Sequence, residues 1–313
     1  MSAPDLPLDA SLQIGFMTGA NGPKAARQTA ELADRLGFDS LWVGDHIAFA
    51  IPILDPLLQL AQLAAFSSRV KLCTGVYLLP LRHPVAAAKQ IATLDQLCEG
   101  RLIFGVGVGG EFPGEYEACG VPVKQRGARL AEALPLVREL VRGAAVTGRG
   151  AFYPFPETRL LPPSPQQGGP PIWCGGRSSK ALARMGRLAD GWISYVVTPE
   201  MYRDGLDQIA RAASAAGRQL ERFGSGHLLF MRLDDTREAA LETATDHLST
   251  RYAMDFRRAA DRYSALGRPA DVAEKIHEFR EAGLRHIVLD LVGPMADRDE
   301  QLERFANEVR PLL

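Results

Sequence analysis

The stretch "AELADRLGFDSLWVGDH", residues 30–46, decides the fold. A helical pattern stops at Gly37, and residues 40–43 follow as a short apolar run that is typical of a buried strand. The strand then finishes on a carboxylate and an imidazole, Asp45 and His46. A parallel α/β sheet with a site at its carboxyl edge requires this order of elements: first a helix, then a buried strand, then a polar end to that strand.

The same alternation of strand and helix continues along the chain. Strands are predicted at residues 12–17, 40–43, 70–77, 101–108, 171–174, 191–197, 226–233 and 286–292. Helices are predicted at residues 23–36, 56–66, 84–97, 127–141, 179–188, 199–216, 237–254, 270–282 and 297–309. Eight βα units predict a single (β/α)8 TIM barrel over residues 1–313, with a proline-rich insertion at about 142–170 after the fourth unit. A doubly wound open sheet is the alternative, but no G-x-G-x-x-G follows the first strand.

Composition restricts the class of protein. Of the 313 residues, 46% are hydrophobic and 23% are charged, which is typical of a globular chain. The formal net charge is −1, and the sequence has no basic stripe that would bind nucleic acid. The four cysteines form no C-x-x-C and no cluster with zinc spacing, so we expect no metal site and a cytoplasmic location. We also expect no membrane segment, because no apolar run reaches about 18 residues.

In a TIM barrel the carboxyl ends of the strands face the active site, which places Asp45 and His46 at the mouth. A carboxylate beside an imidazole can fix its tautomer and raise its pKa, so we interpret His46 as a proton donor held by Asp45. The alternative is that Asp45 caps the next segment and His46 is a packed polar residue. Among the other histidines, we expect His83 to cap a helix and His227 and His286 to lie at the amino ends of strands.

Glycines supply a second signal at two strand ends. "FGVGVGG", residues 104–110, has glycine at alternate positions, including Gly107 and Gly109, which favours close approach of a flat ring, or else a bulge or barrel corner. "GGRSS", residues 175–179, leads into a helix whose N-terminal N–H groups, together with Arg177, suit a phosphate. The alternative for this second turn is a plain helix cap by Ser178 or Ser179.

Four stretches together resemble the bacterial luciferase-like monooxygenase superfamily. They are residues 30–46, "KLCTGVYLLPLRHPVAAAKQIATLDQLCEGRLIFGVGVGG" at 71–110, "GGRSSKALARMGRLADGW" at 175–192 and "GRPADVAEKIHEFREAGLRHIVL" at 267–289. The resemblance implies a TIM barrel that binds FMN or the deazaflavin F420 over its mouth, and an insertion that shapes the substrate cavity. Its oxidoreductases act on small organic substrates by hydride transfer or oxygen activation.

The resemblance also assigns residues. A bulge at Thr74-Gly75-Val76, with a cis bond between Gly75 and Val76, would support the cofactor ring. Gly175, Gly176, Arg177 and Ser178 would meet the cofactor phosphate. Asp45, His46 and a glutamate after the strand-four glycines resemble F420-dependent dehydrogenases, which favours F420 slightly over FMN. Glu111 is the predicted glutamate; the loop is one residue longer than the related form, and Glu115 is its alternative.

Two other functions stay open at this point. One is a non-catalytic flavin-binding relative, and the other is a metal- or phosphate-dependent barrel lyase or hydrolase, although no lysine stands at a strand end. The substrate is not readable: residues 16–18 and the insertion aromatics Phe152, Tyr153 and Phe155 would line an apolar pocket or belong to the core. A homodimer is left open.

Overall fold

The computed structural model describes residues 6–19, 21–49, 52–110 and 112–313. Its strands are β1 (Gln13–Met17), β2 (Ser40–Val43), β3 (Lys71–Thr74), β4 (Leu102–Val106), β5 (Val146–Gly148), β6 (Phe155–Thr158), β7 (Ile172–Gly175), β8 (Gly191–Tyr195), β9 (Gly224–Leu233), β10 (Ala265–Gly267) and β11 (His286–Leu291). Its α-helices are α1 (Gly22–Arg35), α2 (Pro56–Ala64), α3 (Pro84–Leu97), α4 (Pro113–Ala118), α5 (Arg126–Val141), α6 (Ser179–Leu188), α7 (Pro199–Ala215), α8 (Arg237–Tyr252), α9 (Arg257–Tyr263), α10 (Pro269–Glu281) and α11 (Arg298–Arg304).

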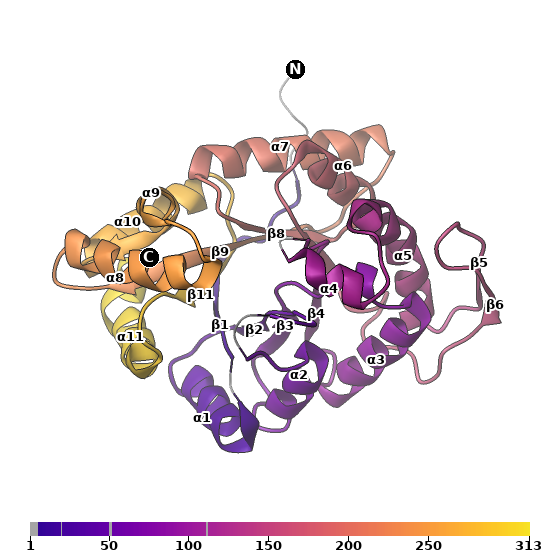
Figure 1. Cartoon of the computed structure of the whole chain (residues 1–313), viewed down its shortest axis with the longest axis horizontal. Coiled ribbons are helices and arrows are strands. Elements are labelled where there is room, and N and C mark those ends of the chain that lie inside the picture. The colour runs from indigo at the N-terminus through magenta and orange to yellow at the C-terminus, as the bar shows by residue number, and fades with distance from the viewer. Residues whose placement is uncertain (1–5, 20, 50–51, 111) are drawn as a thin grey trace.

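The strands close into a parallel barrel. The main sheet has nine strands in the order β10-β9-β11-β1-β2-β3-β4-β7-β8, and an additional pairing of β8 with β9 closes it. Without β10, which only extends the β9 edge, eight parallel strands form the ring, and the helices surround it (Figure 1). The predicted TIM barrel is therefore confirmed, and the open doubly wound sheet is wrong.

Large aromatic side chains fill the barrel interior. Trp42 from β2 and Trp173 from β7 have ring centroids 5.7 Å apart, and His286 of β11 meets both rings edge-on at 5.5 and 5.4 Å. The Ser40 hydroxyl lies 2.7 Å from His286 Nε2 and accepts from Trp42 Nε1 at 2.8 Å. We call Trp42, Trp173 and His286 the aromatic layer; it blocks the middle of the barrel, as expected for a packed core rather than a pore.

Helices α2, α3 and α7 begin where the sequence provides both a side-chain cap and a proline. The Asp55 carboxylate accepts from the N–H groups of Leu57 and Leu58, and the Thr198 hydroxyl accepts from Met201 N–H. Proline follows each of these caps, where its missing N–H costs nothing. His83 caps α3 by accepting from Val85 N–H at 3.3 Å, as predicted. These start signals explain why the predicted helix boundaries agree closely with the structure.

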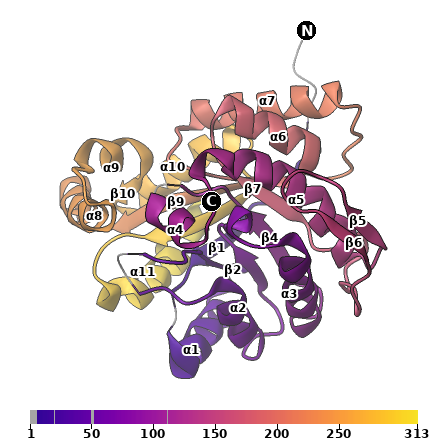
Figure 2. The ribbon, with the colours of Figure 1, turned by 45° about the vertical axis from the view of Figure 1, so that its right-hand side comes forward.

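The insertion carries a short hairpin, and three short elements elsewhere in the chain were not predicted. Strands β5 and β6 pair antiparallel outside α5 (Figure 2), and the Glu132 carboxylate of α5 accepts from Tyr153 N–H at 2.8 Å. Tyr153 and Phe16 are buried with the main core, which favours the core alternative for both. The short helices α4 and α9 and the strand β10 were not predicted, because six or seven residues show too little periodicity.

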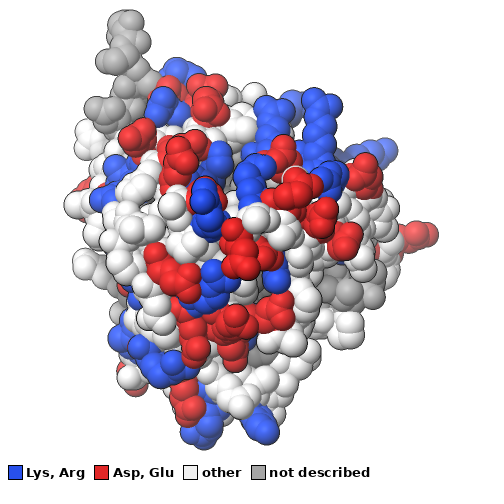
Figure 3. Space-filling model, turned by 90° about the vertical axis from the view of Figure 1, so that its left-hand side faces the viewer, with Lys and Arg blue, Asp and Glu red and all other residues white. Residues whose placement is uncertain are grey.

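Charges of both signs are interspersed on the face that carries α8 and α9 (Figure 3). Arg257 pairs with Glu238 at 2.5 Å and Arg237 with Asp261 at 2.7 Å. Within the described ranges, no helix has both the length and the apolar character that crossing a membrane requires.

Candidate functional site

The end of β2 brings His46 against a buried carboxylate from another loop. His46 Nδ1 lies 2.8 Å from Glu115 Oε1, and the second oxygen of Glu115 accepts from Ile47 N–H at 2.6 Å. The Glu115 side chain is only 4% exposed, whereas that of His46 is 23% exposed. A buried carboxylate fixed by a backbone N–H therefore holds one ring nitrogen of a half-open imidazole.

Two phenylalanines hold the same imidazole in place. The Phe49 ring stacks on His46 with centroids 4.0 Å apart and an interplanar angle of 5°, and Phe112 meets it edge-on at 5.4 Å. Among the described residues, the hydrogen bond recorded for the His46 ring uses Nδ1. The orientation therefore leaves Nε2 as the nitrogen that can serve a ligand at the mouth.

Asp45 has different partners from those predicted. Its carboxylate accepts from Leu78 N–H at 2.8 Å and from both terminal nitrogens of Arg82, one of them at 2.9 Å. The Asp45 side chain is fully buried and Arg82 is 16% exposed, with its guanidinium 4.3 Å from the Tyr77 ring centroid. Burial opposes the charge of Arg82, but the hydrogen bond and charge of Asp45 outweigh it and raise the pKa of Arg82. Asp45 thus joins the end of β2 to the loop after β3, and Glu115 is the carboxylate that contacts His46.

The loop after β3 forms the predicted bulge. The peptide bond between Gly75 and Val76 is cis, as the resemblance implied. Gly75 N–H donates to Val43 O at 2.7 Å, and the Thr74 hydroxyl donates to Gly105 O at 2.7 Å. The bulge is therefore tied to the strands on both sides of it.

Glycines on β4 and β7 make room for this bulge. A Cβ on Gly105 would lie 1.9 Å from Thr74 O, and a Cβ on Gly107 would lie 2.3 Å from a methyl of Val76. Gly175 lies on the other side of the same Val76 side chain, with 3.1 Å to its hypothetical Cβ. Gly109 has a φ of +52° and lies against Leu78. The atoms that come close to these glycines thus belong to the end of β3 and the loop after it. This agrees with the alternative interpretation, in which the glycines accommodate a bulge.

Gly105→Ala should destabilise the barrel by about 1–3 kcal/mol or more, since overpacking against backbone cannot be relieved by a rotamer change. The free energy of unfolding in urea measures the effect. Gly19→Ala is the matched control, because a Cβ there meets nothing within 4 Å. Equal stability of the two variants would show that the bulge yields easily.

The turn between β7 and α6 presents a cation at a helix N-terminus. Gly176 has a φ of +122°, a conformation that favours glycine, and Arg177 is exposed, with its guanidinium 5.4 Å from the Tyr195 ring centroid. Ser178 caps α6 by accepting from Ala181 N–H at 3.3 Å. Ser178 therefore caps the helix, as the alternative interpretation of this turn predicted. The exposed Arg177 lies next to this cap.

The carboxyl end of β11, two strands from β2, carries an ion pair that the sequence did not suggest. Asp290, near the end of β11, binds Arg251 of α8 at 2.7 Å, and Arg251 also lies 2.9 Å from His247 Nε2. Burial and the neighbouring guanidinium lower the pKa of His247. The sequence feature that could have indicated this ion pair is Asp290, a carboxylate near the end of an otherwise apolar strand.

The remaining predicted residues are placed as follows. Glu111 lies outside the described residues, and its alternative Glu115 is the glutamate beside His46. Arg82, Phe49 and Phe112 were not predicted, although Arg82 is the charged residue within "YLLPLRHP". Across the described part of the chain, no group of three or more His, Cys, Asp or Glu side chains is arranged to hold a metal ion.

Comparison with known proteins gives a consistent picture. A model of the luciferase-like monooxygenase family matches residues 10–286. An F420-dependent glucose-6-phosphate dehydrogenase from Nakamurella multipartita is 28% identical, with 96% of each chain covered. The oxygenase component of a flavin-dependent trigonelline monooxygenase from Acinetobacter baylyi is 35% identical over 48% of this chain and 42% of its own.

A solved structure supports the fold. The coenzyme F420-dependent tetrahydromethanopterin reductase from Methanopyrus kandleri superimposes with a TM-score of 0.81, covering 96% of this chain and 99% of its own, at 21% identity. At this identity the likeness shows a shared barrel.

Proposed function

Since this chain belongs to the luciferase-like monooxygenase family, we propose that it is an oxidoreductase that uses F420 to exchange a hydride with a small organic substrate. The contact between His46 and the buried Glu115 carries the proposal. Support for F420 comes from two F420-dependent glucose-6-phosphate dehydrogenases, each 28% identical over 96% of this chain.

Hydride chemistry on an alcohol or carbonyl needs a proton partner. When an alcohol carbon loses hydride and becomes a carbonyl, its hydroxyl group loses one proton, and the reverse reaction returns both. His46 Nε2 would accept that proton, while Glu115 holds Nδ1 and stabilises the imidazolium that forms. Asp45 and Arg82 would act as positioning residues, because their ion pair fixes the segment that leads into His46.

The mouth fits a deazaflavin or flavin cofactor, which supplies the hydride acceptor and donor when it is bound. Val76 is half-buried on the bulge and lies next to Gly107 and Gly175. A flat ring could therefore rest on the Val76 side chain. Arg177 and the first turn of α6 would hold the phosphate. Gly107, Gly109, Gly175 and Gly176 would contribute backbone surface around the ring and phosphate.

Arg177→Ala should weaken cofactor binding about tenfold or more, because a hydrogen bond between charged groups contributes roughly 1.5–3 kcal/mol. Titration followed by cofactor fluorescence gives the dissociation constant. Arg187→Ala is the control, since Arg187 is exposed in the last turn of the same helix. Equal constants for the two variants would move the phosphate away from this turn.

A flavin-dependent monooxygenase is the second candidate, favoured by the relative that is 35% identical. Titration of the purified protein with F420 and with FMN separates the two. We expect F420 to bind at least about tenfold more tightly. Tighter binding of FMN would favour the monooxygenase. Binding without turnover of any reduced cofactor would support a non-catalytic relative, and failure of both to bind would contradict the proposal.

A further inference from the structure

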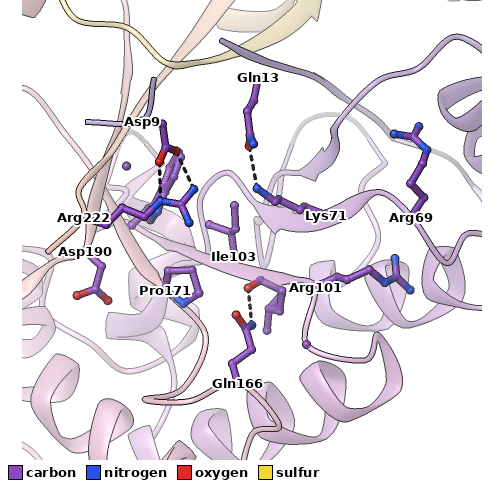
Figure 4. A pocket seen from close by; sticks show the side chains of 14 residues that line it. Asp9, Gln13, Arg69, Lys71, Arg101, Ile103, Gln166, Pro171, Asp190 and Arg222 are labelled. Carbon is purple, nitrogen blue, oxygen red and sulfur yellow. Dashed lines mark hydrogen bonds and ion pairs between the residues drawn. The ribbon is translucent and has the colours of Figure 1, made fainter. Parts of the chain in front are cut away.

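A cavity lies at the end of the barrel opposite to His46. It has a volume of about 310 Å³ and is lined by the first residues of several strands, including Gln13 of β1, Lys71 of β3 and Gly224 of β9 (Figure 4). Since the strands are parallel, these residues lie at the amino end of the barrel. The aromatic layer stands between this amino-end cavity and the mouth, so the cavity is not an extension of the candidate active site.

The polar wall of the amino-end cavity offers donors rather than acceptors. Lys71 Nζ donates to Gln13 Oε1 at 2.8 Å, which uses one of the three ammonium hydrogens and leaves the Gln13 amide NH2 as a further donor. Arg222 is paired through two nitrogens with Asp9, each at 2.7 Å. Among the described residues that line the cavity, Lys71 and Arg101 are cations without a carboxylate partner, and Lys71 keeps two ammonium hydrogens after its bond to Gln13.

The other charged residues at the cavity are engaged outside it. The Arg101 guanidinium donates to Val70 O and Ser67 O, and that of Arg69 to Phe38 O, and both point away in Figure 4. The Asp190 carboxylate accepts from Ile172 N–H at 2.9 Å and pairs with Arg138 at 2.9 Å. Its negative charge is thus already compensated and does not oppose an anion at Lys71.

The remaining wall is apolar and partly flat. Trp173 and Ile103 are each 5% exposed, and Pro171 stands beside them. Burial, and then the charge of Lys71, lower the pKa of His286 to about 3, so the imidazole behind Trp173 is neutral. One cation facing a flat apolar wall is the arrangement that suits a ligand with one anionic group and a ring.

We propose that the amino-end cavity binds a small organic anion, with its carboxylate at Lys71 and Gln13 and its flat apolar body against Trp173. The volume fits one compact ligand, at the low end of the range for small-molecule sites. The proposal is independent of the function at the mouth, because no residue is shared between the two sites.

Calorimetric titration of the cofactor-loaded protein with benzoate tests the proposal. We expect one benzoate per chain, and acetate, which lacks the ring, should bind at least about tenfold more weakly. Lys71→Met should weaken benzoate binding about tenfold or more, whereas Lys24→Met, on the exposed surface of α1, should leave it within about twofold. Gln13→Leu, which keeps the lysine, gives an independent variant should Lys71→Met fail to fold.

Three results would overturn the proposal. They are no saturable benzoate binding at millimolar concentration, equal affinity for acetate and benzoate, and unchanged affinity in both Lys71→Met and Gln13→Leu. His46→Ala tests whether benzoate binds at the mouth of the barrel instead. We expect this variant to leave the benzoate affinity unchanged. A loss of affinity as large as that of Lys71→Met would place the ligand at the mouth.

Discussion

His46→Ala is expected to lower kcat by about 10²–10⁴, the usual contribution of a positioned general acid or base. The affinity for the cofactor should change much less, because the imidazole is held by Glu115 and Phe49 rather than by the turn that would bind phosphate. Single-turnover kinetics with a panel of alcohols and a fluorescence titration measure both quantities on one variant. Glu115→Gln should give a smaller loss, since the amide keeps a hydrogen bond but not the charge.

The control is His83→Ala, which removes an exposed imidazole that caps α3 and contacts the rings of Tyr153 and Phe155 in the insertion. Its kcat should match that of the wild type. If His46→Ala instead kept kcat and lost cofactor binding, His46 would position the ring, and Glu111 or Glu115 would become the proton donor. If neither quantity changed, the Asp-His ending of β2 would be structural.

Asp45→Ala is expected to lower the free energy of unfolding by about 3–5 kcal/mol, because it leaves the largely buried Arg82 guanidinium with only the half-exposed Asp55, at 3.8 Å, as a charged partner. The loss should exceed that of the double variant Asp45→Ala/Arg82→Leu, in which no uncompensated charge remains. Urea unfolding followed by circular dichroism measures both.

Asp261→Ala is the matched control for this ion pair. It breaks an Arg–Asp contact of 2.7 Å whose side chains are about half exposed, and pairs of that kind contribute about 0–1 kcal/mol. A loss for Asp45→Ala no larger than for Asp261→Ala would show that the Asp45–Arg82 pair does not fasten β2 to the following loop.

The sequence predicted the barrel well because each βα unit carries its own local signals. The predicted strand at 40–43 and the helices at 84–97 and 179–188 match β2, α3 and α6 without shift. The predicted strand at 70–77 was too long, since β3 ends at Thr74, where the bulge begins. Apolar character continues through the bulge, so hydrophobicity alone could not locate the end.

The candidate site was predicted less completely, because its contacts join segments far apart in the chain. Glu115 is 69 residues from His46, and Asp45 is 37 residues from Arg82. Adjacency in sequence suggested that Asp45 would hold His46, but Asp45 is engaged by Leu78 and Arg82 on the loop after β3. Nothing local indicated that α4 would bring Glu115 to that position.

The aromatic layer has a consequence for the timing of proton exchange with water. Trp42 is fully buried and Trp173 nearly so, which leaves the mouth as the route by which solvent reaches the imidazole of His46. If His46 takes up the substrate proton as proposed, bound substrate and cofactor would cover that route and keep the proton on the imidazole until product departs.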